Sequence, residues 1–216
     1  MFKKNIIWLF LILSLTWCFW ENTKEVPQLS SEQYIEKLSQ LWYFKYVETE
    51  EIDRVKEEMS RSFTKYNTFF YSSYFDYNDK IAISSDYRSA SFDIETIGES
   101  GWIKKSLDRI APIFERVWAK FSYTEDIDIF EDNHYVHKII LNQTEYIIYD
   151  GDISDFEWPR ISTINFLEMV NTELKKQWIN EKLYLFWEWS VILLSDEIHD
   201  FILPLCSERE YPNNDL

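Results

Sequence analysis

The chain has 216 residues, 46% of them apolar and 19% aromatic, and its 22 basic and 38 acidic side chains give a formal net charge of −16. This composition excludes a disordered chain, which is poor in aromatic and apolar residues. It also excludes nucleic acid as a partner, because phosphate backbones are bound by Lys and Arg. Only three glycines are present, too few for the Gly-rich loops that hold nucleotide phosphates, so we expect no nucleotide and no cofactor.

The N-terminus has the pattern of an export signal. Lys3 and Lys4 precede an apolar run over residues 6–20, and the chain becomes polar directly afterwards, at Glu21. This order predicts a secretory signal or a membrane anchor over residues 1–20. An uncleaved anchor is the first interpretation, because residues 15–20 contain no small-x-small cleavage site. The alternative is a buried helix at the start of a cytosolic domain.

Two further processing routes are open. Residues 15–18 (Leu-Thr-Trp-Cys) loosely resemble a bacterial lipoprotein box, in which Cys18 is lipidated, although Trp17 stands where that pattern has a small residue. Simple secretion is the third route. The first 20 residues hold two lysines and no acid, so removing their charge of +2 from −16 leaves −18 on the remainder. Because positive charge is retained in the cytoplasm, we expect a membrane-associated body on the outer side of the cytoplasmic membrane, in the cell envelope.

The body after this segment is expected to be a single domain. Residues 21–30 are predicted as a linker, residues 31–207 as one α+β domain, and residues 208–216 as a flexible tail. Two lobes, 31–131 and 132–207, are the alternative, although no linker-like stretch separates them. Cys206 is the only thiol of the body, so no internal disulfide is available, and its apolar surroundings predict a packed free cysteine.

Hydrophobic periodicity predicts the elements in chain order. Trp42, Trp118 and Trp178 are assigned to the buried stripes of the first, third and fourth helices, and Pro112 is expected to kink or split the third. The last third has the order ββαββα, so the predicted fold is α+β, with antiparallel sheets and helices packed on one face. The predicted helices cover residues 30–42, 49–63, 100–121, 161–178 and 195–203, and the predicted strands cover residues 68–75, 80–84, 89–95, 134–141, 144–149, 182–187 and 190–194.

No catalytic or metal constellation is convincing. Gly98-Glu99-Ser100-Gly101 fails as a nucleophile elbow because Trp102 occupies the second glycine position, and Ser100 is better explained as a helix cap. His134 and His137, three apart on a strand, point to opposite faces and are interpreted as edge or surface histidines. A triad that uses these or His199 stays open, because its members need not be close in sequence.

Acidic residues cluster in two segments. Asp150, Asp152 and Asp155 form a candidate weak cation loop, but the glycine and glutamate positions of a calcium-binding EF-hand loop do not match, and a solvated loop is favoured. The acidic run that begins at Asp126 has the same interpretation. Paired carboxylates among 38 acids leave an envelope hydrolase as an alternative function.

Aromatic residues outside the predicted helices suggest a binding surface. A strand covered on both faces explains most of them, and an exposed recognition surface is the alternative. We therefore expect a non-catalytic binding protein of the immunity or inhibitor type in a bacterial envelope, with a basic protein and the membrane as partners. A structural envelope lipoprotein is a further alternative. The candidate partner surface comprises Tyr66, Tyr71, Tyr74, Tyr77, Trp187 and Trp189.

Overall fold

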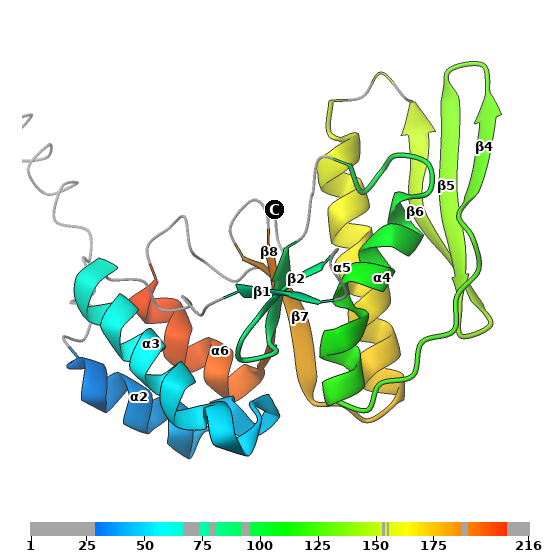
Figure 1. The fold of residues 1–216 in the computed structure, drawn as a ribbon. Coiled ribbons are helices and arrows are strands. Elements are labelled where there is room, and N and C mark those ends of the chain that lie inside the picture. Colours follow the sequence, from blue (N-terminus) through cyan, green and yellow to red (C-terminus); the bar gives the residue numbers. More distant parts are fainter. Residues whose placement is uncertain are drawn as a thin grey trace, which may run out of the picture.

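The computed structural model describes residues 29–66, 74–77, 81–91, 96–152, 154, 156–186 and 190–206. Within these residues the chain is an α+β protein with two antiparallel sheets and five α-helices (Figure 1). The export segment expected over residues 1–20 and the tail expected over residues 208–216 lie outside them. Among the helices that the structure describes, none is long and apolar enough to cross a membrane.

The larger sheet has five strands in the order β1-β2-β3-β8-β7. Strand β8 pairs with both β3 and β7, so segments about 100 residues apart in the chain share one sheet. The continuous apolar run Val191–Leu194 explains this place, because a strand with neighbours on both sides and cover on both faces has no polar face. The strands are β1 (Tyr74–Tyr77), β2 (Ile81–Ser84), β3 (Ser89–Ser91), β7 (Glu181–Phe186) and β8 (Ser190–Ser195).

The smaller sheet is the meander β4 (Ile127–Glu131), β5 (His134–Leu141) and β6 (Thr144–Asp152). Alternate residues of β5 are buried, as expected for a strand with one covered face. Asn142 and Gln143 connect β5 to β6 with φ values of 48° and 68°. Positive φ at both turn residues is typical of a two-residue hairpin, so the predicted hairpin is confirmed.

Helices cover both faces of the larger sheet. Helices α2 (Ser31–Gln40), α3 (Ile52–Tyr66) and α6 (Asp196–Ile202) lie on one side, and α4 (Trp102–Arg116) and α5 (Trp158–Lys176) lie between the two sheets (Figure 1). Two hydrophobic cores result, one on each face of the larger sheet. Three short 3₁₀ helices complete the order: η1 (Tyr43–Tyr46), η2 (Thr49–Glu51) and η3 (Leu203–Leu205).

The expectation that helices pack on one face is wrong for the larger sheet. Val191 and Leu193 of β8 point into the core with α4 and α5, whereas Ile192 and Leu194 point into the core with α2, α3 and α6. The order ββαββα is present as β5-β6-α5-β7-β8-α6, but its two hairpins belong to different sheets. Because β8 has apolar residues on both faces, each face of the sheet is covered by its own layer of helices.

Serine side chains cap α2 and α6, and Pro112 does not divide α4 into two helices. Ser30 and Gln33 form a reciprocal capping box at the start of α2, and the Ser195 hydroxyl accepts a bond from the Ile198 amide at the start of α6. Helix α4 passes through Pro112 as a single helix, so the predicted split is absent. Cys206 is a buried free cysteine, as predicted.

Candidate functional site

The partner surface expected from the sequence falls largely outside the described residues. Tyr66 ends α3, and Tyr74 and Tyr77 begin and end β1, but only their backbone is described. Tyr71, Trp187 and Trp189 lie outside the described residues, so this surface stays a prediction.

The candidate cation loop is largely part of a strand. Asp150 and Asp152 lie in β6, and the Asp150 carboxylate is 2.8 Å from His134 Nε2. Asp152 accepts hydrogen bonds from the backbone amide of Ser154 at 2.8 Å and from its hydroxyl at 2.7 Å, and these bonds lower the pKa of Asp152. Asp155 lies outside the described residues. Within them, no group of three or more His, Cys, Asp or Glu side chains is placed to hold a metal ion.

The interpretation of His137 as an edge or surface histidine is wrong. His137 lies on the central strand β5 with its side chain fully buried, and Nε2 is 2.9 Å from Asp126 Oδ2 and 3.6 Å from Asp128 Oδ1. The side chain of Asp126 is itself only 2% exposed, so it is not part of a solvated run. Its carboxylate accepts the backbone amides of Ile103 and Lys104, each at 3.0 Å. Asp126 thus caps α4 from a distant segment and holds the histidine in place.

Ser100 does not cap α4, contrary to the prediction. Gly101 is the cap residue, with φ at +76°, where a side chain would be strained. The Ser100 hydroxyl instead donates to Asp128, and the Tyr135 hydroxyl donates to the other oxygen of Asp128 at 2.6 Å. Because Ser100 bonds a carboxylate and not a histidine, these residues do not form a Ser-His-Asp triad.

A small cavity, which we call the aromatic pocket, opens beside this cluster and has a volume of about 240 Å³. The Phe130 and Tyr135 rings stack with centroids 4.4 Å apart, and the Tyr149 and Trp158 rings meet edge to face at 6.3 Å. Tyr135 and Tyr149 are buried, whereas Phe130 is 60% exposed at the edge. The pocket is lined by Gly98, Glu99, Ser100, Phe130, Tyr135, Tyr149 and Trp158.

Gly98 makes this pocket sterically possible. A Cβ atom at this position would lie 1.8 Å from Trp158 Cζ3 and 2.1 Å from Cε3. The indole therefore rests directly on the backbone that precedes α4. Because any other residue would displace the ring, glycine is the residue that this packing requires.

Acidic residues are frequent in the segments that form the aromatic pocket, and we call them the acidic rim. Glu99 lines the pocket, the Asp128 carboxylate accepts a bond from Tyr135, and the Asp152 main-chain carbonyl accepts one from Tyr149. The other three adjoin a lining residue in the chain. Among the described neighbours, basic groups are few: Arg160 lies 3.5 Å from Glu157, and His134 lies beside Asp150. Burial, together with the hydrogen bond and charge of Asp128, raises the pKa of Tyr135, which therefore stays protonated. The acidic rim consists of Glu99, Asp128, Glu131, Asp150, Asp152 and Glu157.

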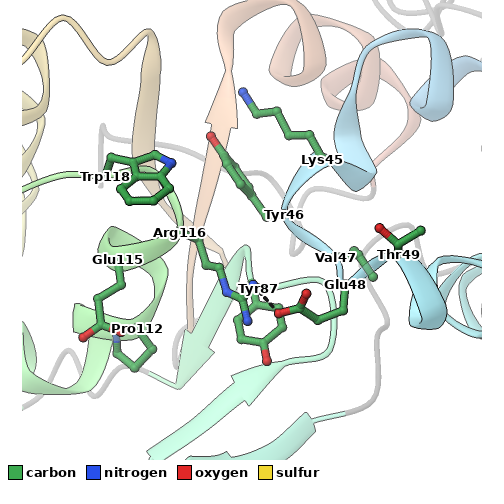
Figure 2. A pocket seen from close by; sticks show the side chains of 10 residues that line it. All are labelled: Lys45, Tyr46, Val47, Glu48, Thr49, Tyr87, Pro112, Glu115, Arg116 and Trp118. Carbon is green, nitrogen blue, oxygen red and sulfur yellow. Dashed lines mark hydrogen bonds and ion pairs between the residues drawn. The ribbon is translucent and has the colours of Figure 1, made fainter.

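A second cavity, of about 420 Å³, lies between η1 and the C-terminal end of α4. Figure 2 shows the Arg116 guanidinium over the Tyr87 ring and directed at Glu48, with Trp118 on the opposite side. The guanidinium carbon is 3.8 Å from the ring centroid, and Nη1 is 2.6 Å from the Glu48 carboxylate. The side chain of Arg116 is therefore held by two partners and is not free to bind an anion.

A buried arginine contacts Tyr46, which lines this second cavity. Arg88 is fully buried, and its guanidinium donates to the carbonyl oxygens of Tyr43 at 2.6 Å and Leu193 at 2.9 Å. It also lies 4.8 Å from the centroid of the Tyr46 ring and 3.5 Å from the Glu181 carboxylate. These bonds connect η1 to β3, β7 and β8, so the role of Arg88 is structural.

Three exposed tryptophans stand at helix ends, and we call the surface that they share the tryptophan end. Trp42, Trp118 and Trp178 follow the C-caps of α2, α4 and α5 and have φ values of 60°, 61° and 62°. Their exposed fractions are 74%, 88% and 92%. The prediction that they belong to buried stripes is wrong, because each helix stops two residues before its tryptophan and the chain then turns outward.

A sequence signal for these helix ends exists. Each tryptophan follows a basic residue of the last helical turn, namely Lys37, Arg116 and the pair Lys175 and Lys176. Basic residues are favoured in the last turn by the helix dipole. The position after a helix C-cap is commonly a glycine, and here it is a tryptophan in all three helices. The sequence pattern therefore did not indicate where these helices end.

Comparisons with known proteins give no assignment: no family model matches the chain, and neither the curated proteins nor the solved structures that were searched contain a match.

Proposed function

We propose that the chain is a non-catalytic protein-binding module of a cell envelope, tethered through residues 1–20, whose aromatic pocket captures a basic segment of a partner protein. One observation carries this proposal: a cavity with four aromatic rings in its wall is lined by Glu99 and is formed by segments that carry the acidic rim. Aromatic faces attract Lys and Arg side chains. Carboxylates around the cavity accelerate the encounter with a basic partner.

The size of the aromatic pocket favours a single side chain as its occupant. At about 240 Å³ it is smaller than the roughly 300–1,000 Å³ of sites that enclose a drug-sized ligand. Glu99 lines the pocket, where it can pair with a cationic head group. A basic side chain presented on a protein surface therefore suits the pocket better than a free small molecule. An immunity or inhibitor protein that holds a basic toxin has these properties.

The envelope hydrolase has less support. A general acid needs a carboxyl group with a raised pKa, but every carboxyl group in the described residues with a clearly shifted pKa is shifted downward. Glu32, Asp152 and Asp196 are lowered mainly by hydrogen bonds to their carboxylates. For Glu173, burial opposes the shift, but bonds from Lys176 and other neighbours bring its pKa below the usual value. A structural envelope lipoprotein would not need a pocket with this wall.

The proposal is tested by peptide titration. The probe is a ten-residue Gly/Ser peptide with two central lysines, and its isostere carries norleucine at both positions. We expect the lysine peptide to bind the full chain, with an affinity that falls as salt is added, and the norleucine peptide to bind far more weakly. Isothermal titration calorimetry at low and high salt measures both.

Two phenylalanines supply a matched pair of variants. Phe130→Ala removes one ring of the pocket and should weaken lysine-peptide binding by about 0.5–2 kcal/mol. Phe156→Ala removes a ring that is 96% exposed and does not line the pocket, so it should leave the affinity unchanged. Equal losses in both variants, or equal affinity for the two peptides, would contradict the proposal.

A further inference from the structure

The three residues of the tryptophan end are arranged in space as one surface. Helices α2, α4 and α5 finish at the same end of the molecule, the lower end in Figure 1. A chain of contacts connects the three helix ends. The Trp42 carbonyl accepts a bond from Arg88, whose guanidinium lies under Tyr46. Tyr46 and Trp118 line the same cavity (Figure 2), and the Lys120 amide donates to Gln177, the neighbour of Trp178, at 2.7 Å.

The charge of this end differs from that of the chain as a whole. Lys37, Lys120 and Lys175 are exposed and make no ion pair among the described residues. The acids of this region are largely occupied: Glu48 binds Arg116 at 2.6 Å, Glu181 binds Lys45 at 2.7 Å, and Glu173 binds Lys176 at 2.6 Å. Three acids of the region are exposed and make no ion pair among the described residues: Glu36, Glu50 and Glu115. Unpaired lysines and large aromatic surface therefore coincide at one end of a chain whose net charge is −16, and this end lacks the acidic excess of the chain as a whole.

This combination fits an anionic lipid surface. Tryptophan is enriched where a protein meets the interface of a bilayer, because the ring is apolar and the indole N–H binds polar groups. Each lysine near an anionic leaflet strengthens binding by about fivefold. We propose that Trp42, Trp118 and Trp178, with Lys37, Lys120 and Lys175, dock the body on the anionic surface of the membrane that holds it.

The length of the N-terminal chain agrees with this orientation. Eight residues, 21–28, separate the apolar run from the first described residue, and an extended chain of that length spans about 27 Å. Helix α2 has ten residues and is about 15 Å long. A tether that joins the start of α2 can therefore reach the level of its end, where Trp42 lies. This step rests on the proposed membrane tether.

Docking in this orientation leaves the aromatic pocket accessible. The pocket lies where α4 and α5 begin, and the tryptophan end lies where they finish (Figure 1). With 19 residues, α5 separates the two ends by about 28 Å. The acidic rim then faces away from the anionic lipid, which would repel it.

Oxidative footprinting of the full chain tests the docking. The chain is added to vesicles of phosphatidylcholine with one quarter phosphatidylglycerol, to pure phosphatidylcholine vesicles, or to lipid-free detergent, and the oxidation of each tryptophan by hydroxyl radicals is measured by mass spectrometry. We expect oxidation of Trp42, Trp118 and Trp178 to fall at least threefold with anionic vesicles and less with neutral ones. Phe156, at the opposite end, should be oxidised equally in all three.

Variants and a second measurement separate docking from tethering. Lys120→Glu with Lys175→Glu should abolish the difference between anionic and neutral vesicles while the chain still floats with both in high salt. Equal oxidation of the three tryptophans with and without anionic vesicles overturns the docking proposal, whether or not the chain floats. Protection that grows with protein concentration in the absence of lipid also overturns it, in favour of a second copy of the chain. If anionic vesicles protect the tryptophans at low salt but the chain no longer floats with vesicles in high salt, the result would contradict the tether and leave the docking proposal standing.

Discussion

Replacing Trp178 by glycine should stabilise the protein relative to replacing it by alanine. The chain after α5 ends in a Schellman motif, in which the Trp178 amide donates to the Lys175 carbonyl at 3.0 Å and the Ile179 amide donates to the Leu174 carbonyl at 3.1 Å. This motif requires positive φ at its central residue, and Trp178 has φ at 62°. Alanine keeps the strain of that conformation, whereas glycine removes it.

The size of the effect follows from two opposing terms. A left-handed conformation costs a residue with a Cβ about 1–2 kcal/mol. Glycine loses about 0.5–1 kcal/mol more conformational free energy on folding. Trp178 is so exposed that both variants give up the same small contact, about 20 Å² or ~0.5 kcal/mol. Glycine should therefore exceed alanine by about 0.5–1 kcal/mol in free energy of unfolding, which corresponds to roughly 1–4 °C in Tm for a chain of this size.

The assay is thermal and urea unfolding of the full chain in mild detergent, followed by far-UV circular dichroism. Phe156 provides the control pair, because it is equally exposed and is not among the residues with positive φ. At position 156 the glycine variant should be less stable than the alanine variant, because glycine raises the conformational entropy of the unfolded chain. If glycine at Trp178 is not more stable than alanine, the strain assigned to this position does not exist.

Three further outcomes are expected. Gln143→Gly, at φ 68° in the β5–β6 turn, should raise stability by about 0.5–1 kcal/mol in urea unfolding. Gly98→Ala should lower stability by about 1–3 kcal/mol and weaken lysine-peptide binding, because the new methyl group would overlap the Trp158 ring; unchanged stability would contradict this packing. Hydrogen bonds lower the folded-state pKa of Glu173, so this residue contributes stability above its unfolded pKa of about 4.3. Urea unfolding should show that Glu173→Gln destabilises the protein at pH 7 and that the difference shrinks as the pH falls below that value.

Local signals in the sequence predicted the elements that depend on neighbouring residues. Ser30 with Gln33, and Ser195 alone, cap helices where their side-chain chemistry indicates. Asn142 and Gln143 form the predicted turn between two alternating segments. In each of these cases the partner groups lie within four residues of one another, so no knowledge of the tertiary fold is needed.

Features that depend on distant contacts were missed. Asp126 and His137 are eleven positions apart, and nothing in the sequence shows that the Asp126 carboxylate contacts both His137 of β5 and the start of α4. The aromatic pocket draws its wall from segments near residues 98–100, 130, 135, 149 and 158. Those segments meet only because α4 and α5 lie between two sheets, and composition cannot reveal that arrangement.

Helix physics explains the charges at the two ends of the molecule but not the tryptophans. Carboxylates such as Asp126 are favoured at the start of a helix, and lysines such as Lys175 are favoured in its last turn, because of the helix dipole. No such argument selects tryptophan at the position after the C-cap. Glycine at that position would relieve the backbone strain, and almost no buried surface would be lost with the exposed indole. Trp42, Trp118 and Trp178 thus occupy strained, exposed sites that stability alone would give to another residue. The docking proposed above supplies a reason for these side chains that the fold does not supply.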